Sequence, residues 1–545
     1  MIIIRFIQFL PYSAEILGFI SLGMIASFLS LPLASFAATI NLQIIEDASG
    51  KTVPARVLLC AADGTCYYPD DAVLLKIAND VWFMSSGESQ FSVPSGEALL
   101  RVERGKEYLR VKESINIPTT GSLSHKVILK RWVNMSERGY QCGENHLHRA
   151  PEDVAALCAA EDLDYGTVLQ WWNRPRFGVP EGSGHLRDLN FAGITIPTSV
   201  YDVEVEEAWG ALYLINMPNP FPFLNDPHMP NLPAAKYGRE HDALNCYQSG
   251  WSREVLIDAL LGYVDVVNVC NNNFHMHRFQ PRSFYSNLLN VKGFPVYPDT
   301  PEGMMRMNED TYYRLLNCGL KLAAGAGSAT GAKEVPVGYD RAYVRVANSG
   351  GHEEFIEAWR TGKNFVTNGP MLLFRSTNGL RPGDSLNVRK PAKLKFDIEV
   401  DSDSPLSTVE IVVNGQVAKS FNIAEGKKKF VATATLEFSQ SSWVCARCTD
   451  TDKLLTDDEL AAYDGPPTKF TQKPCRLRFA HTSPIYIKID GQDIVVEKSV
   501  REGLKMIDAF EKFSRENVGP KYREMISNAI NKARAILLHK LNAKS

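Results

Sequence analysis

The chain has 545 residues, with 59 basic and 62 acidic side chains and a formal net charge of −3. This balance offers no basic surface of the kind that nucleic-acid-binding proteins need, so we expect no nucleic-acid partner. A hydrophobic content of 45% is ordinary for globular protein. The length is too great for one hydrophobic core and suggests about three domains.

Residues 1–37 predict a signal peptide. Arg5 precedes an apolar run over residues 16–33, and Ser35-Phe36-Ala37 places small residues where a signal peptidase cleaves. The mature chain would then begin near Ala38 and be secreted or periplasmic. An uncleaved membrane anchor is the alternative, since the run approaches the length that spans a bilayer. We favour cleavage because the small-residue site follows the run directly.

Residues 38–131 predict a β-sandwich. Short β-rich runs alternate with turn residues, which is typical of that fold. Cys60 and Cys66 flank a turn that contains Asp63-Gly64, so a hairpin disulfide is expected. The expected strands cover residues 40–45, 55–60, 91–94, 98–102 and 126–129.

Residues 132–370 show strand and helix patterns in alternation. Helical spacing covers residues 152–163, and a second helix over residues 252–261 would be capped by Ser252. Buried-strand runs cover residues 167–169 and 264–269. The alternation favours a parallel α/β architecture, in which chemistry sits at the carboxyl ends of the strands.

Residues 371–497 predict a second β-sandwich, with strands over 392–400, 409–413 and 484–489 and a hairpin turn at Asn414-Gly415. Cys445 and Cys448 have the spacing of a redox or zinc site. A zinc ribbon needs a second such pair, however, and only Cys475 follows. We therefore favour a structural disulfide that involves Cys475.

Residues 498–545 predict a helical tail with a break at Gly519-Pro520. An apolar stripe runs along one helical face, and we expect it to pack on the neighbouring domain rather than on a membrane. The stripe comprises Met506, Ile507, Phe510 and Phe513.

Two His-x-His pairs use four of the 11 histidines: His146 with His148, and His275 with His277. Random placement would give only ~0.2 such pairs. On a β-strand the side chains at i and i+2 leave the same face, so each pair could present two imidazoles to one point. This arrangement favours metal binding.

The first pair lies in a recognisable series of motifs. Residues 143–153, followed by residues 160–163 and Trp171-Trp172-Asn173, resemble the opening of the CehA/McbA-type metallohydrolase domain, a relative of the PHP (polymerase and histidinol phosphatase) fold. The resemblance implies a distorted (β/α) barrel of seven strands with a metal-dependent hydrolytic centre, flanked here by the two sandwiches. Further matches, in order, are residues 203–205 with Trp209-Gly210, residues 313–319, residues 325–331 with Val337-Gly338-Tyr339, and residues 365–370.

The resemblance implies three metal ligands. His146 and His148 match the family's first His-x-His motif, at the end of the first barrel strand, and Glu204 matches its bridging glutamate. Glu206 would share a strand face with Glu204 and is the competing carboxylate. Imidazole and carboxylate together suit Zn²⁺, with Mn²⁺ or Fe²⁺ as alternatives.

Several PHP ligand positions hold residues that cannot bind a metal. An indole, Trp172, replaces one ligand, and Ala211 stands where a histidine is expected. The late motif loses both its Asp and its His, to Ala329 and Gly331. A three-metal PHP centre cannot be assembled from these positions.

Three histidines outside the PHP pattern could complete a smaller site. The second pair follows a predicted strand and lies where a barrel's active site would be, so we expect His275 or His277 to bind the metal and assign His275 to it. His277 and His241 are then candidates for the general base. The alternative is that the second pair only forms hydrogen bonds with Asn271-Asn272-Asn273.

These features predict an exported metal-dependent hydrolase that acts on an ester, carbamate or phosphoester bond of a small-molecule or carbohydrate substrate. The alternative is a decayed barrel whose sandwiches bind a carbohydrate or a protein partner. Trp171 and Trp172 fit core packing, or an aromatic wall for substrate. We do not expect a serine hydrolase, because the chain has no Gly-x-Ser-x-Gly motif.

Overall fold

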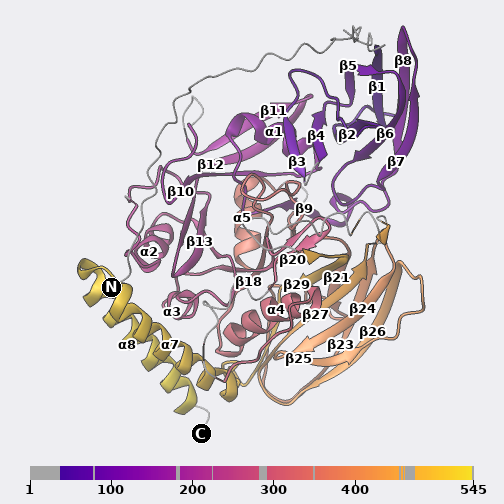
Figure 1. Cartoon of the computed structure of the whole chain (residues 1–545). Helices are drawn as coiled ribbons and strands as arrows, with labels where there is room; N and C mark the ends of the chain where they lie inside the picture. The colour runs from indigo at the N-terminus through magenta and orange to yellow at the C-terminus, as the bar shows by residue number, and fades with distance from the viewer. Residues whose placement is uncertain are drawn as a thin grey trace, which may run out of the picture.

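The computed structural model describes residues 37–77, 80–178, 184–223, 225–281, 291, 293–347, 350–452, 456–457, 460 and 473–542. The predicted signal peptide therefore lies outside the described residues, apart from Ala37. The fold is a mixed α/β structure dominated by strands in several sheets (Figure 1). Within the described ranges, no helix is long and apolar enough to cross a membrane.

The N-terminal region consists of two sheets that enclose one hydrophobic core, and all the expected strands are present. Alternate side chains of each strand point inward because successive residues of a strand face opposite sides. The expected Cys60–Cys66 disulfide is confirmed. One sheet has the order β5 (Glu88–Pro94), β1 (Ala37–Glu46), β8 (Ser122–Leu129); the other has the order β3 (Leu74–Ile77), β4 (Asp80–Ser85), β2 (Ala55–Ala61), β6 (Gly96–Glu103), β7 (Val111–Ile117).

The middle of the chain builds a seven-stranded sheet with helices packed against it. Its order is β10 (Gly166–Trp172), β12 (Ile194–Glu207), β13 (Gly210–Ile215), β14 (Leu244–Tyr247), β15 (Val266–Asn271), β18 (Ala323–Gly327), and β11 (Leu186–Phe191) also pairs with β12. The helices are α1 (Pro151–Ala160), α2 (Leu232–Glu240), α3 (Val255–Leu260), α4 (Pro301–Asn317) and α5 (His352–Arg360).

Two local predictions for this region are wrong. The sheet is mixed rather than parallel, because only Ala208 and Trp209 separate β12 from β13, and a parallel crossover needs a dozen or more residues. Helix α3 begins at Val255 with Glu254 as its N-cap residue, so Ser252 does not cap it. The Ser252 hydroxyl lies 3.4 Å from that of Ser249 instead.

Residues 144–148 lie between β10 and β18. The Asn145 N–H donates to the Ala326 carbonyl in β18 at 3.1 Å, and the Leu169 N–H in β10 donates to the Leu147 carbonyl at 3.2 Å. The Ala329 N–H, just past β18, donates to the His146 carbonyl at 2.7 Å. The backbone that carries the first histidine pair is therefore held on both sides.

The C-terminal region shares a nine-stranded sheet with the middle of the chain, across the predicted boundary at residue 370. Its order is β22 (Ser385–Val388), β30 (Ile485–Ile489), β27 (Ser442–Thr451), β29 (Leu477–Thr482), β20 (Asn364–Thr367), β19 (Arg341–Arg345), β9 (Tyr140–Gly143), with β24 (Leu406–Val413) and β25 (Gln416–Ser420) beside β27. A second sheet has the order β21 (Met371–Ser376), β23 (Ala392–Asp401), β26 (Lys429–Phe438), and a small sheet joins β16 (Phe274–His275), β17 (Arg278–Phe279) and β28 (Lys473–Pro474).

The predicted disulfide at Cys475 is wrong. Cys445, Cys448 and Cys475 are all free and buried. Cys445 and Cys448 both lie in β27, three residues apart, so their side chains leave opposite faces of the strand and enter different hydrophobic clusters. The spacing that resembles a redox or zinc site is therefore a consequence of core packing.

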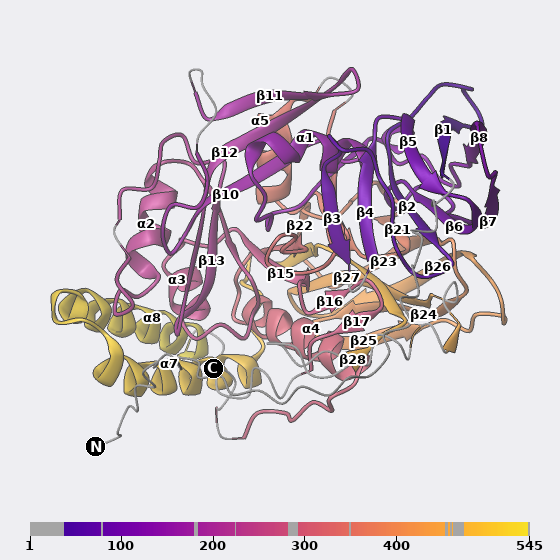
Figure 2. The same cartoon turned by 45° about the horizontal axis from the view of Figure 1, so that its top comes forward.

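The helical tail packs on the protein, as predicted, but on helices α3 and α4 of the middle region (Figure 2). It comprises α7 (Glu497–Asn517), the short 3-10 helix η3 (Pro520–Tyr522) and α8 (Arg523–Asn542), with the expected break before η3. Ile507 and Phe510 are buried, and the rings of Phe510 and Phe513 lie 6.1 and 5.2 Å from that of Trp209.

Buried ion pairs connect the three regions of the chain. Arg56 of β2 binds Glu161, at the end of α1, at 2.6 Å. Arg110, which precedes β7, binds Asp452, which follows β27, at 3.0 Å. Because a partly buried charge needs its partner in place, these pairs fix how the regions are oriented.

Candidate metal centre

Three side chains from two chain segments converge inside the middle region. His146 and His148 lie just after β9, and Glu204 lies in β12, directly opposite Tyr213 of β13. The three residues are 3%, 7% and 1% exposed. Because β12 is held between β10 and β13, the backbone fixes the direction of Glu204 as firmly as that of the histidines.

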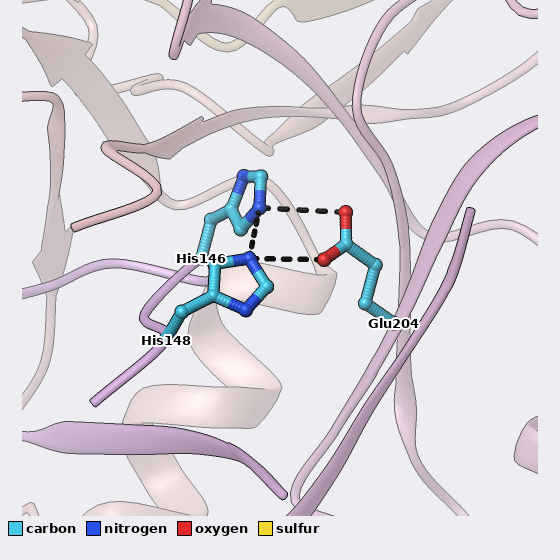
Figure 3. A group of neighbouring side chains, drawn as sticks. All are labelled: His146, His148 and Glu204. Carbon is cyan, nitrogen blue, oxygen red and sulfur yellow. Dashed lines mark hydrogen bonds and ion pairs between the residues drawn. The ribbon is translucent and has the colours of Figure 1, made fainter. Parts of the chain in front are cut away.

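The donor atoms of these residues face one point (Figure 3). The His146 and His148 Nε2 atoms are 2.9 Å apart, and they lie 3.4 and 3.0 Å from the Glu204 Oε1 and Oε2 atoms. For metal–nitrogen bonds of ~2.0–2.1 Å at tetrahedral angles, neighbouring ligand atoms lie roughly 3.3 Å apart. Among the residues that the structure describes, these three form a group of His, Cys, Asp or Glu side chains whose donor atoms all lie within 4.8 Å of one another.

The charges in the group suit a cation. Burial alone would raise the pKa of Glu204, but the two neighbouring imidazoles outweigh it and lower the pKa to about 2, so the carboxylate is ionised. Burial lowers the pKa of His146, which favours the neutral imidazole that ligates metals. The Glu204 Oε2 atom is buried, and the His148 Nε2 atom lies 3.0 Å from it. An ionised carboxylate and two imidazoles, aimed at one point and shielded from water, fit a divalent metal.

Tyr213 is a site residue that the sequence reasoning missed. Its hydroxyl oxygen lies 2.9 Å from the His146 Nδ1 atom, and the residue is fully buried. When Nε2 binds a metal, Nδ1 carries the proton and donates to the Tyr213 oxygen, which fixes the tautomer and the ring orientation. The sequence feature that could have identified Tyr213 is the two-residue turn after Glu207, because that turn places Tyr213 opposite Glu204.

Replacing Tyr213 with phenylalanine should lower metal affinity about 10–100-fold, which is the usual effect of losing such a partner. The ring remains to fill its space, so the fold should be retained. Competition with a chelating dye measures the change. An unchanged affinity with an unchanged melting temperature would show that the hydroxyl does not orient His146.

Trp172 covers the centre on the side of His148. Its ring centroid lies 4.4 Å from that of His148, and its Nε1 donates to the Glu206 Oε2 at 3.0 Å. Glu206 shares the strand face of Glu204 but binds Trp172 instead of joining the group. Trp171 belongs to the core, 4.8 Å from the ring of Phe221, so of the two tryptophans only Trp172 forms a wall of the site.

The second histidine pair does not join the group. His275 and His277 are buried near the carboxyl end of β15, as expected, but the His275 Nε2 lies 2.8 Å from the Asn272 carbonyl oxygen. For His275, this matches the alternative in which the second pair bonds to the asparagine run. Burial lowers the pKa of His277 to about 4, with Asp452 opposing the shift.

His241 also lies away from the group. It follows the last residue of α2, and its Nδ1 lies 2.9 Å from the Tyr237 carbonyl oxygen. His241 comes before β14 in the chain. Glu204 is paired with Tyr213, and Tyr213 is paired with Cys246 of β14, so the metal group lies at the level of Cys246. The structure thus places His241 beyond the amino end of the strand, so it does not assemble the predicted general base with the metal ligands.

Comparison of the chain with protein-family models and with curated proteins found no match. The resemblance to CehA/McbA-type domains therefore stays a prediction from the sequence motifs. The grouping of His146, His148 and Glu204 is an independent observation, because it depends on how the strands pair.

Proposed function

We propose that the chain is a metal-dependent hydrolase of the CehA/McbA type, which acts on an ester, carbamate or phosphoester bond. The observation that carries this proposal is the convergence of two imidazoles and one ionised carboxylate in a buried group. The substrate would be a small molecule or a carbohydrate. Its class is a prediction from the family resemblance.

The course of the backbone supports a PHP-like barrel. The parallel strands β14, β15 and β18 are followed by the segment 144–148, which β18 and β10 hold on either side. Positions that hold ligands in PHP proteins also surround the group here. The ring of Trp172 packs on His148, and Ala329 bonds to the backbone of His146.

We assign Zn²⁺ to the centre, with Mn²⁺ and Fe²⁺ as alternatives, because two imidazoles and a carboxylate suit all three. A metal held by three protein ligands supplies an open position and Lewis acidity, and it lowers the pKa of water. The chain itself holds the donors, keeps Glu204 ionised, orients His146 through Tyr213 and shields the group with Trp172.

The chain's location is part of the proposal. We infer export through the signal peptide predicted at residues 1–37, which gives a secreted or periplasmic protein. The Cys60–Cys66 disulfide supports this inference, since disulfides persist in oxidising compartments.

A second candidate function is a binding protein in which the barrel is catalytically decayed. The nearly complete burial of the three ligands favours it, because a substrate must reach a metal to react there. The substitutions at Trp172, Ala211, Ala329 and Gly331 favour it as well. In that case the metal would stabilise the fold.

Aryl ester, carbamate and phosphoester substrates distinguish the two functions. The metal-loaded protein should hydrolyse one class, and the His148→Ala variant should lose that activity together with the metal. If the wild-type protein holds its metal and turns over none of the three classes, the hydrolase proposal is wrong and the binding protein is retained.

A further inference from the structure

A cleft lies on the outer face of the three-stranded sheet β21-β23-β26, where the sheet meets η1 (Ser136–Arg138) and β9. Its volume of about 560 Å³ falls in the range of small-molecule sites, roughly 300–1,000 Å³. None of the metal-group residues lines it. Its lining residues come from both the middle region and the C-terminal region, on either side of the predicted boundary at residue 370.

Two apolar side chains contribute to the floor of the cleft. Val431, near the start of β26, is 74% exposed, and Leu373 of β21 is half-buried. Both residues are paired with Glu399 of β23, on either side of it, so they share one face of the sheet. A valine and a leucine on the same face of a concave site, with Glu399 between them, offer contact surface for an apolar ligand.

The carboxylates of the cleft already have partners. Arg138 binds Glu399 at 2.8 Å, and Arg375 lies 3.7 Å from Asp397. Arg381 also lines the cleft and is half-buried, yet no carboxylate among the described residues lies within ion-pair distance of its side chain. The cleft therefore has an excess of positive charge.

Tyr140 adds a hydrogen-bonding group. The residue is 9% exposed and lines the cleft, and its hydroxyl has no hydrogen-bond partner among the residues that the structure describes. Arg345 lies directly opposite Tyr140 in the sheet. Like Arg381, it is half-buried and has no carboxylate partner in the described ranges. Burial raises the pKa of Tyr140, and the positive charges of Arg345, Arg381 and Arg138 oppose that shift.

We propose that this cleft is a second binding site, for an organic anion with an apolar body. The anionic group binds Arg381 and the Tyr140 hydroxyl, and the apolar part lies over Leu373 and Val431. A guanidinium and a phenol donate to carboxylate or sulfonate oxygens, whereas a cation would be repelled. The proposal is independent of the metal centre and holds for either function considered above.

Binding of 8-anilinonaphthalene-1-sulfonate, an aromatic sulfonate that fluoresces in apolar surroundings, tests the proposal in the full-length protein. Octanoate should displace the dye at least about tenfold more effectively than octan-1-ol, which has the same chain without the charge. Arg381→Gln should weaken dye and octanoate binding about tenfold. Arg389→Gln, an exposed arginine outside the cleft, should leave both unchanged.

A second variant addresses the apolar floor. Val431→Asn leaves the charge of the cleft unchanged. It should weaken the binding of octanoate more than the binding of acetate, because it removes contact with the alkyl chain and not with the carboxylate. The proposal is overturned if the wild-type protein binds no dye, if Arg381→Gln binds dye and octanoate like the wild type, or if octan-1-ol displaces the dye as well as octanoate does.

Discussion

The His148→Ala variant should fail to retain stoichiometric metal, with an affinity lowered about a thousandfold or more, well beyond the 10–100-fold loss that follows removal of an outer partner. His148 supplies one of only two imidazoles in the group, and its Nε2 lies 3.0 Å from the Glu204 carboxylate. A methyl group at this position cannot coordinate. The residue is also only 7% exposed, so bulk water has little access to this position. Metal analysis after dialysis and a chelator competition measure the loss.

Two other histidines serve as matched controls. His275→Ala should keep metal affinity within about threefold of the wild type, because the His275 Nε2 is occupied by the Asn272 carbonyl rather than by the group. His352→Ala removes a buried imidazole that packs on Tyr165, and it should likewise leave the metal in place. Equal loss of metal in all three variants would mean that the loss reports on folding and not on ligation.

Replacing Arg478 with methionine should destabilise the C-terminal region by about 3–5 kcal/mol, the usual cost of leaving a buried charge without its partner. Arg478 in β29 forms two hydrogen bonds of 2.8 Å to Asp450, the residue opposite it in β27, and it also binds Asp403. Asp450 is fully buried. The expected fall in melting temperature is on the order of 10 °C, read from the transition of the affected region.

The control for this substitution is Arg501→Met in α7. Arg501 also forms an ion pair, with Glu497 at 2.7 Å, but both side chains are mostly exposed. Exposed pairs contribute about 0–1 kcal/mol, so the melting temperature should change by no more than ~2 °C. If Arg478→Met melts like Arg501→Met, the buried pair does not stabilise the region.

The strands and the first histidine pair could be predicted from local patterns. Residues 40–44 alternate apolar and polar side chains, and β1 lies there with the apolar ones buried. The His146-x-His148 spacing predicted convergence because the i and i+2 side chains share a face, and both imidazoles do meet Glu204. These inferences needed only the period of a strand and one motif.

Features that depend on how distant segments meet could not be predicted in the same way. The spacing of His275 and His277 equals that of the first pair, but only the path of the chain after β15 turns their rings to other partners. Cys445 and Cys448 show the same limit, since their spacing resembles a metal motif while the strand separates their side chains. Tyr213 was open to prediction only through the register of the β12-β13 hairpin.

Metal analysis of the purified protein, combined with X-ray absorption spectroscopy at the metal edge, tests the metal centre most directly. After incubation with Zn²⁺ and dialysis, we expect about one metal per chain, with nitrogen and oxygen neighbours at ~2.0–2.2 Å and two imidazole signals. Absence of stoichiometric metal would contradict the account. So would sulfur neighbours at ~2.3 Å, since they would place the metal on cysteines instead of on His146, His148 and Glu204.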